Sequence, residues 1–313
     1  MIKVQHRFLV FFLLIGSMHS IGQDLKVYTV GGYGNGETML YYVSLSDSYS
    51  YSENETEQDA IIPDEYLGDL ENTEMLHFEL KSEYRKRFLS RLQIAESDSV
   101  FVYFQIQDSV ASYAVSDLSL MAVINMYYSD SDGPVTFQDY MIGFDFGNLQ
   151  SGDFVVISNQ NPFQTGKLKP LLWQETQADQ FPGNTKLEPE YHHVQPTETG
   201  KTYISTSDNY TYYVQELLHE GRLIGRKLAV VHTFRKDIVL DHFLMDGESA
   251  SSAPLNGIQT NTNLAEFYQF AGELFIGKPP VIYGFQFESF GCPAIYFLNQ
   301  NTQPIQTLCD NRH

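Results

Sequence analysis

The segment 188–193 holds the densest group of side chains that could bind a metal ion. Imidazole nitrogens and carboxylate oxygens are both ligands of zinc. The segment has no H-E-x-x-H motif, and adjacent side chains on an extended chain point in opposite directions. The favoured interpretation is a proline-bounded loop without a metal, and a zinc site is the alternative. The candidate ligands are Glu188, Glu190, His192 and His193.

Two acidic segments could bind calcium. Asp130 and Asp132 belong to a D-x-D-G fragment before Pro134, and these residue types are typical of a hairpin turn. The segment 46–74 carries ten acidic and no basic residues, which favours a solvated loop. Carboxylates suit a hard cation such as calcium, but neither segment has the spacing of an EF-hand. We expect no cofactor, with calcium as the alternative.

Motifs for nucleophilic catalysis are absent from the sequence, which contains neither G-x-S-x-G nor S-x-x-K. His232 could face Asp241 or His242 across a turn at 235–237, but without a third partner a packed histidine is favoured. Glycoside hydrolysis needs only two carboxylates at a suitable separation. Because the chain has 39 acidic residues, any fold would supply such a pair, so their number indicates little.

The first 23 residues have the layout of a secretory signal peptide. Lys3 and Arg7 precede an apolar run at 8–15, and small residues follow at 16–22. The run is far shorter than the ~20 residues that span a bilayer. We therefore expect an exported protein from which residues 1–23 are removed, and which is secreted, periplasmic or at the cell surface.

The formal net charge and the lengths of the apolar segments limit the classes of partner that the protein could bind. The formal charge is −20, and removal of Lys3 and Arg7 makes it −22. Nucleic acids and anionic lipids bind through cationic contacts, so we expect neither as a partner. No segment after residue 23 has 18 consecutive apolar residues, so no integral membrane segment is expected in the processed chain.

The only two cysteines, Cys292 and Cys309, lie near the end of the chain. An even number of cysteines in an exported protein predicts a disulfide. A metal-binding or catalytic pair is the alternative, but the C-x-x-C spacing is missing. We expect the disulfide to join the last two strands as a C-terminal hairpin.

The pattern of Val, Ile, Tyr and Phe runs separated by Asp, Ser and Gly predicts a mainly β protein with antiparallel, sandwich- or barrel-like sheets. One clear helix is predicted at about 82–95, and a short second helix is possible at about 263–272. The expected organisation is a β-rich region at 24–160, a linker or long loop at 161–200 and a β-rich region at 201–313.

The predicted helix carries an apolar face and a set of cations that could form an anion or partner patch. Pairing with the protein's own acids is favoured. The cations are Lys81, Arg85, Lys86, Arg87 and Arg91.

These observations favour a non-catalytic exported protein that binds an extracellular or envelope ligand through a tyrosine-rich β surface. An extracellular glycan hydrolase with a carboxylate pair is one alternative. A structural component of the cell envelope is the other.

Overall fold

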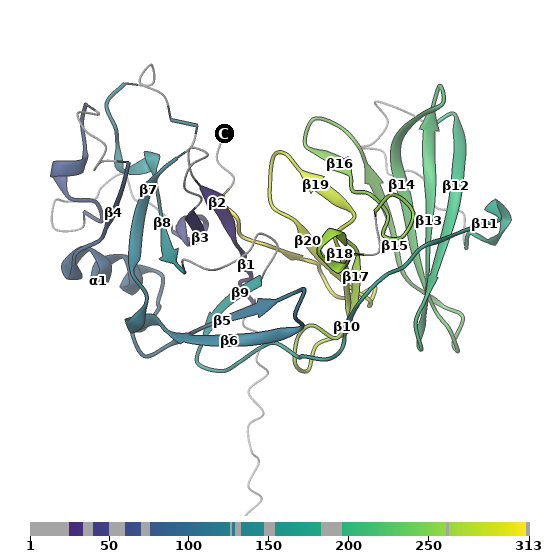
Figure 1. Ribbon diagram of the computed structural model, residues 1–313, viewed down its shortest axis with the longest axis horizontal. Helices are drawn as coiled ribbons and strands as arrows, with labels where there is room; N and C mark the ends of the chain where they lie inside the picture. Colours follow the sequence, from purple (N-terminus) through teal and green to yellow (C-terminus); the bar gives the residue numbers. More distant parts are fainter. Residues whose placement is uncertain are drawn as a thin grey trace, which may run out of the picture.

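The computed structural model describes residues 25–33, 40–49, 60–69, 76–125, 127–128, 133–146, 154–182, 196–260 and 263–310. It confirms a mainly β fold with antiparallel sheets, none of which closes into a barrel (Figure 1). Among these residues no helix has the length and apolar character needed to cross a bilayer.

Two sheets are built from the chain up to residue 158, at the left of Figure 1. Sheet I has the order β2-β3-β8-β7-β4, and sheet II has the order β1-β9-β5-β6. The strands of sheet I are β2 Gly31–Tyr33, β3 Leu40–Ser44, β4 His77–Glu79, β7 Leu120–Ile124 and β8 Tyr140–Asp145. Those of sheet II are β1 Tyr28–Thr29, β5 Ser99–Phe104, β6 Ser109–Ala114 and β9 Phe154–Ser158.

Two further sheets and a ribbon follow in the second half of the chain. Sheet III has the order β10-β17-β18-β20-β21, and sheet IV is β11-β12-β13-β14-β15. Sheet III contains β10 Leu168–Pro170, β17 Phe270–Gly272, β18 Val281–Tyr283, β20 Ala294–Phe297 and β21 Ile305–Gln306. Sheet IV contains β11 Gln174–Thr176, β12 Glu198–Thr206, β13 Tyr210–His219, β14 Arg222–His232 and β15 Ile238–Met245, and the ribbon pairs β16 Ala250–Ser252 with β19 Gln286–Glu288.

Three hydrophobic clusters join the four sheets in a row. Alternate side chains of a strand face opposite sides of its sheet, so Val102 in β5 packs in the cluster between sheets I and II, whereas Tyr103 packs between sheets II and III. In β18, Val281 faces sheet II and Ile282 faces sheet IV. Both central sheets are therefore covered on their two faces. The predicted division at 161–200 contains strands β10 and β11, and separate domains on either side stay a prediction.

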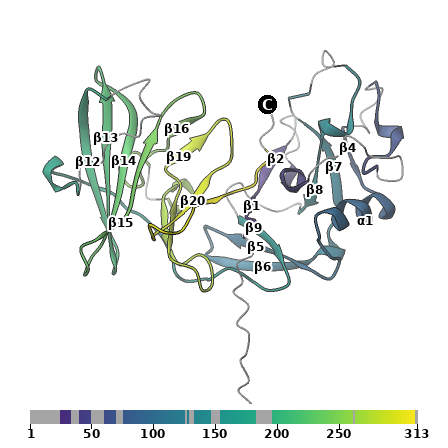
Figure 2. The same ribbon diagram turned by 180° about the vertical axis from the view of Figure 1, so that it is seen from behind.

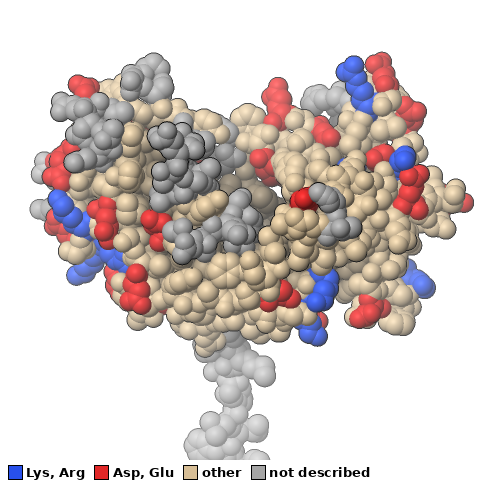
Figure 3. Space-filling model, viewed as in Figure 1, with Lys and Arg blue, Asp and Glu red and all other residues tan. Residues whose placement is uncertain are grey.

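Helix α1, Ser82–Arg91, covers the first cluster with Phe88 and Leu89, both buried. It ends earlier than the predicted residue 95 because Gln93 has a φ of 59°, outside the helical region. Three of its predicted cations pair with the protein's own acids, and Figure 3 shows red side chains interleaved with the blue ones near α1. The pairs are Lys81–Glu65 at 2.8 Å, Arg85–Glu96 at 2.7 Å and Arg87–Glu83 at 3.9 Å.

The possible second helix at 263–272 is reduced to one 3-10 turn, Leu264–Glu266. Asn263 caps the turn by accepting a hydrogen bond from the Ala265 N–H. The chain then becomes β17, because residues 270–272 pair with both β10 and β18. Sheet pairing therefore replaces the helix that the capping pattern allowed.

The C-terminal segment connects sheet III to sheet II. After β21 pairs with β20, Leu308 forms a parallel bridge to Tyr28, and its N–H donates to the Val27 carbonyl at 2.8 Å. The predicted disulfide is present, with the Cα atoms of Cys292 and Cys309 5.6 Å apart. The disulfide therefore fastens the segment between the two sheets that it connects.

Candidate functional site

Six metal-binding candidates from the sequence lie outside the described residues, namely Asp130, Asp132, Glu188, Glu190, His192 and His193, and the acidic segment 46–74 is described only at 46–49 and 60–69. Within the part of the chain that the structure describes, no group of three or more His, Cys, Asp or Glu residues could hold a metal ion. The zinc and calcium alternatives therefore stay predictions from the sequence.

The structure does not bring His232 together with Asp241 or His242. His232 closes the β14–β15 turn, where its Nδ1 accepts from the backbone N–H groups of Phe234 and Arg235. Asp241 lies opposite Ala229, and His242 lies opposite Leu228. The alternative of a facing pair is therefore not realised, because the turn places Asp237 opposite His232 and moves the other two residues further along the strand.

His242 is instead packed at the interface of sheets III and IV, where its Nε2 lies 3.1 Å from the Tyr296 hydroxyl. Burial lowers the pKa of His242, and the Asp241 charge opposes this shift. In the unfolded chain the imidazole of His242 should bind a proton near pH 6.5, whereas in the folded protein it binds one only at lower pH. The free energy of unfolding should therefore decrease as the pH falls below about 6.5.

We expect His242→Gln to reduce this loss, because glutamine can still hydrogen-bond Tyr296 but does not titrate. The measurement is the free energy of unfolding in urea at pH 7.5 and pH 5.5 for both proteins. Equal acid sensitivity in the two proteins would contradict the assignment to His242.

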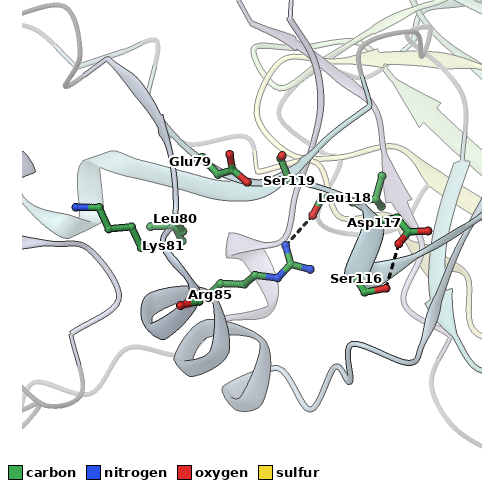
Figure 4. Close-up of a pocket in the computed structure, with 9 residues that line it drawn as sticks. Glu79, Leu80, Lys81, Arg85, Ser116, Asp117, Leu118 and Ser119 are labelled. Atoms are coloured by element: carbon green, nitrogen blue, oxygen red, sulfur yellow. Dashed lines mark hydrogen bonds between the residues drawn. The ribbon is translucent and has the colours of Figure 1, made fainter.

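A polar hollow of about 450 Å³ lies between the start of α1 and the segment 116–119 (Figure 4). Arg85 crosses it and donates from Nη1 to the Leu118 carbonyl at 2.7 Å. Two carboxylates, Glu79 and Asp117, also line it, and none of its described lining residues is a histidine. Because Lys81 and Arg85 are already ion-paired, the hollow presents little unbalanced charge to a ligand.

A second hollow, of about 580 Å³, lies beside the C-terminal segment. Its one carboxylate, Asp47, accepts from the N–H groups of Cys309 and Asp310 at 3.1 and 2.7 Å. Asp47 thus anchors the chain end to the 3-10 turn Ser46–Ser48. Its hydrogen bonds indicate a structural role, and no second carboxylate of the kind a glycosidase needs lines the hollow among the described residues.

A group of four exposed apolar side chains, which we call the Tyr268 patch, lies over sheet III. It consists of Leu172, Ile258, Tyr268 and Phe287, with exposed fractions of 54, 41, 36 and 44%. The rings of Tyr268 and Phe287 are 5.0 Å apart in an edge-to-face arrangement. The ring contact joins Tyr268 and Phe287, and the hydrogen bonds among residues 171, 256 and 269 place Leu172 and Ile258 on adjacent segments. Exposed apolar side chains that gather in this way are typical of an interaction site.

A buried polar network fixes the backbone beneath the patch. Asn256 and Gln269 are fully buried, and their side chains bond the segments that carry the patch residues. Asn256 accepts from the Tyr268 N–H at 2.8 Å and donates to the Leu171 and Gln269 carbonyls at 3.0 and 2.8 Å. Three neighbouring segments are therefore held by one side chain.

Gln269 completes this network. Its Oε1 accepts from the Asn256 N–H at 3.0 Å and from the Trp173 indole at 3.3 Å, while its Nε2 donates to the Pro254 and Gly284 carbonyls. Gly284 has a φ of +86°, and a Cβ there would lie 1.9 Å from the Tyr268 carbonyl oxygen. Only glycine fits this close approach. A fully satisfied buried network of this type rigidifies its surroundings.

Arg226 supports the same turn from sheet IV. It is 1% exposed, donates to the Ala253 carbonyl at 2.5 Å and reaches Gln259 Oε1 at 3.5 Å. Burial lowers the pKa of the guanidinium, and the charges of Glu216 and Asp246 oppose this shift. The turn at 253–259 is therefore hydrogen-bonded by Arg226 of sheet IV in addition to the network of Asn256 and Gln269.

The network could not be found from the sequence. Leu171 and Asn256 are 85 residues apart, and no motif marks an Asn or Gln that will be buried. The tyrosine content pointed only to a general class of surface: Tyr268 is the patch's single tyrosine, and Tyr42, Tyr103 and Tyr140 are buried in the core. The sequence does indicate the turn at 253–259, because Pro254 and Gly257 are typical turn residues, but it does not indicate the network beneath it.

No protein-family model, curated protein or solved structure matches this chain.

Proposed function

We propose that the protein is an exported, non-catalytic binding protein that contacts a partner through the Tyr268 patch. The observation that carries the proposal is the combination of an exposed apolar group with a rigid, buried polar support. Export is supported by the character of residues 1–23 and by the disulfide, since such bonds persist in oxidising compartments.

The polar support favours binding because a preorganised surface loses little conformational freedom when a partner docks. The backbone N–H of Tyr268 is held by Asn256, and the Tyr268 ring contacts Phe287. Aromatic side chains with fixed positions are typical anchors in protein interfaces. The partner should therefore present apolar groups to this patch.

The glycan hydrolase alternative receives less support from the geometry. Burial raises the pKa of Glu288, as a general acid would require. Glu288 lines neither hollow, whereas Glu79 and Asp117 line the first. A glycosidase needs its acid and its second carboxylate on opposite sides of one bound sugar.

Binding through the patch can be tested with a displayed random-peptide library selected on the processed chain. We expect peptides with apolar anchors to be enriched, and their affinity to fall at least about tenfold in Tyr268→Ser/Phe287→Ser, because hot-spot side chains contribute about 2 kcal/mol or more. Titration calorimetry measures the change.

Phe234→Ser is the control, since Phe234 is an exposed aromatic residue in the β14–β15 turn, outside the patch. Peptides that bind the patch variant and the wild type equally would contradict the proposal.

A further inference from the structure

Among the described residues, strand β6 is an edge of sheet II with no strand paired to its outer side. The sheet order ends at β6, and in Figures 1 and 2 no strand is drawn beyond it. Its sequence, SVASYA, contains no charged residue and no proline, and its register with β5 is unbroken from residue 109 to 114. Natural edge strands are usually blunted by charges, prolines, bulges or a covering segment. The strand itself and its pairing show none of the first three.

The other long edge strand, β15, is protected. Asp241 places an exposed charge in the middle of β15. The side-chain amides of Gln286 and Gln300 donate to the carbonyls of Met245 and Ile238 near its ends. The edge at β15 is therefore protected against pairing with a further strand, whereas the edge at β6 has no such protection in its sequence or register.

The outward groups of β6 follow from its pairing with β5. The Val115 N–H donates to the Asp98 carbonyl at 3.0 Å, and hydrogen-bonded pairs alternate along an antiparallel ladder. Residues 109, 111 and 113 therefore bond to β5. Val110, Ser112 and Ala114 direct their N–H and C=O groups away from the sheet, and no strand among the described residues pairs with them.

We propose that β6 pairs with β6 of a second copy of this chain, antiparallel and around a two-fold axis at Ser112. In this register Ser112 faces its own counterpart, and Val110 faces Ala114 of the partner, so that all outward groups gain partners. Tyr113 then lies opposite Ala111 of the other copy. A large ring beside a small side chain fits this close, non-hydrogen-bonded position.

Charge is compatible with self-pairing. The strand is neutral although the chain carries a formal charge of −20. The nearest acids in the sequence are Asp108 and Asp117, and the register places Asp108 opposite Ser116 of the partner rather than opposite another acid. Pairing of one short strand buries less than the roughly 1,000 Å² of a stable interface. The dimer is therefore weak and depends on concentration.

Sedimentation velocity of the processed chain, from about 1 µM to about 1 mM, tests the proposal. We expect the wild type to shift from monomer to dimer across this range. Ser112→Pro removes the N–H at the axis, which an edge strand tolerates, and should weaken association at least about tenfold. Ser112→Ala keeps that N–H and should associate as the wild type does.

Cross-linking gives a second measurement that does not depend on a proline. Under mild oxidation Ser112→Cys should form a covalent dimer, because facing Cα atoms lie about 5.5 Å apart. In Ser116→Cys the two Cα atoms would be about 26 Å apart, so no such dimer is expected. The proposal would be overturned if the wild type stayed monomeric, or if Ser112→Pro associated as strongly as the wild type. It would also be overturned if Ser112→Ala lost association, or if the two cysteine variants cross-linked equally.

Discussion

Asn256→Leu is expected to lower the free energy of unfolding by about 3–5 kcal/mol. Leucine has nearly the same size but leaves the Tyr268 N–H and the Leu171 carbonyl without the Asn256 side chain as their partner, whereas the Gln269 carbonyl keeps the bond from the Leu171 N–H. Each unsatisfied buried group costs about 1–3 kcal/mol, and local relaxation recovers part of the sum. The measurement is urea unfolding followed by the fluorescence of Trp173, which lies in the same network.

Asn299→Leu is the control for this substitution. Asn299 is exposed and accepts one hydrogen bond, from the Asn301 N–H in a surface turn. Its replacement should change the free energy of unfolding by less than about 1 kcal/mol. If Asn256→Leu were as mild as Asn299→Leu, the network would not be the support of the Tyr268 patch.

Asn256→Leu also distinguishes a residue that supports the Tyr268 patch from the residues that contact the partner. Asn256 lies beneath the patch and is fully buried, so it touches no partner. Asn256→Leu should nevertheless weaken peptide binding, because the backbone of Tyr268 loses its fixed position. Tyr268→Ser/Phe287→Ser should weaken binding while changing stability less. The two variants together test whether rigidity contributes to affinity.

Local patterns predicted those parts of the fold that depend on neighbours in sequence. The alternation in 210–218 and 238–245 gave strands close to β13 and β15, and the apolar spacing of Phe88 and Leu89 gave α1. Long-range pairing decided the rest. Residues 168–170 form β10 despite Pro170 because an edge strand tolerates proline, and residues 270–272 joined a sheet instead of a helix.

The candidate site was less predictable than the fold for the same reason. Sheets III and IV bring together residues 171–173, 253–259 and 268–269, which share no local pattern. The cysteines were predictable because their number and position limit the pairings to one. The acidic and histidine-rich segments, by contrast, drew attention through composition alone, and the candidate ligands at 130–132 and 188–193 lie outside the described residues.

Cys292→Ser/Cys309→Ser is expected to destabilise the protein by about 3 kcal/mol. The disulfide closes a segment with a sequence separation of 17, and loop-closure entropy gives about that value. The loss of stability should be largest in the C-terminal segment, where Leu308 hydrogen-bonds to Val27 and where Asp47 accepts from the N–H groups of Cys309 and Asp310. Urea unfolding measures the total, and hydrogen exchange at residues 305–310 locates it.

Reduced wild-type protein provides the comparison, because it breaks the same bond without changing a side chain. It should unfold at the urea concentration of the double serine variant, and both should expose residues 305–310 to exchange before sheet IV. A stability unchanged by reduction would mean that the hydrogen bonds to β1 and Asp47 hold the segment unaided. Residues 1–23 alone would then indicate that the chain folds in an oxidising compartment.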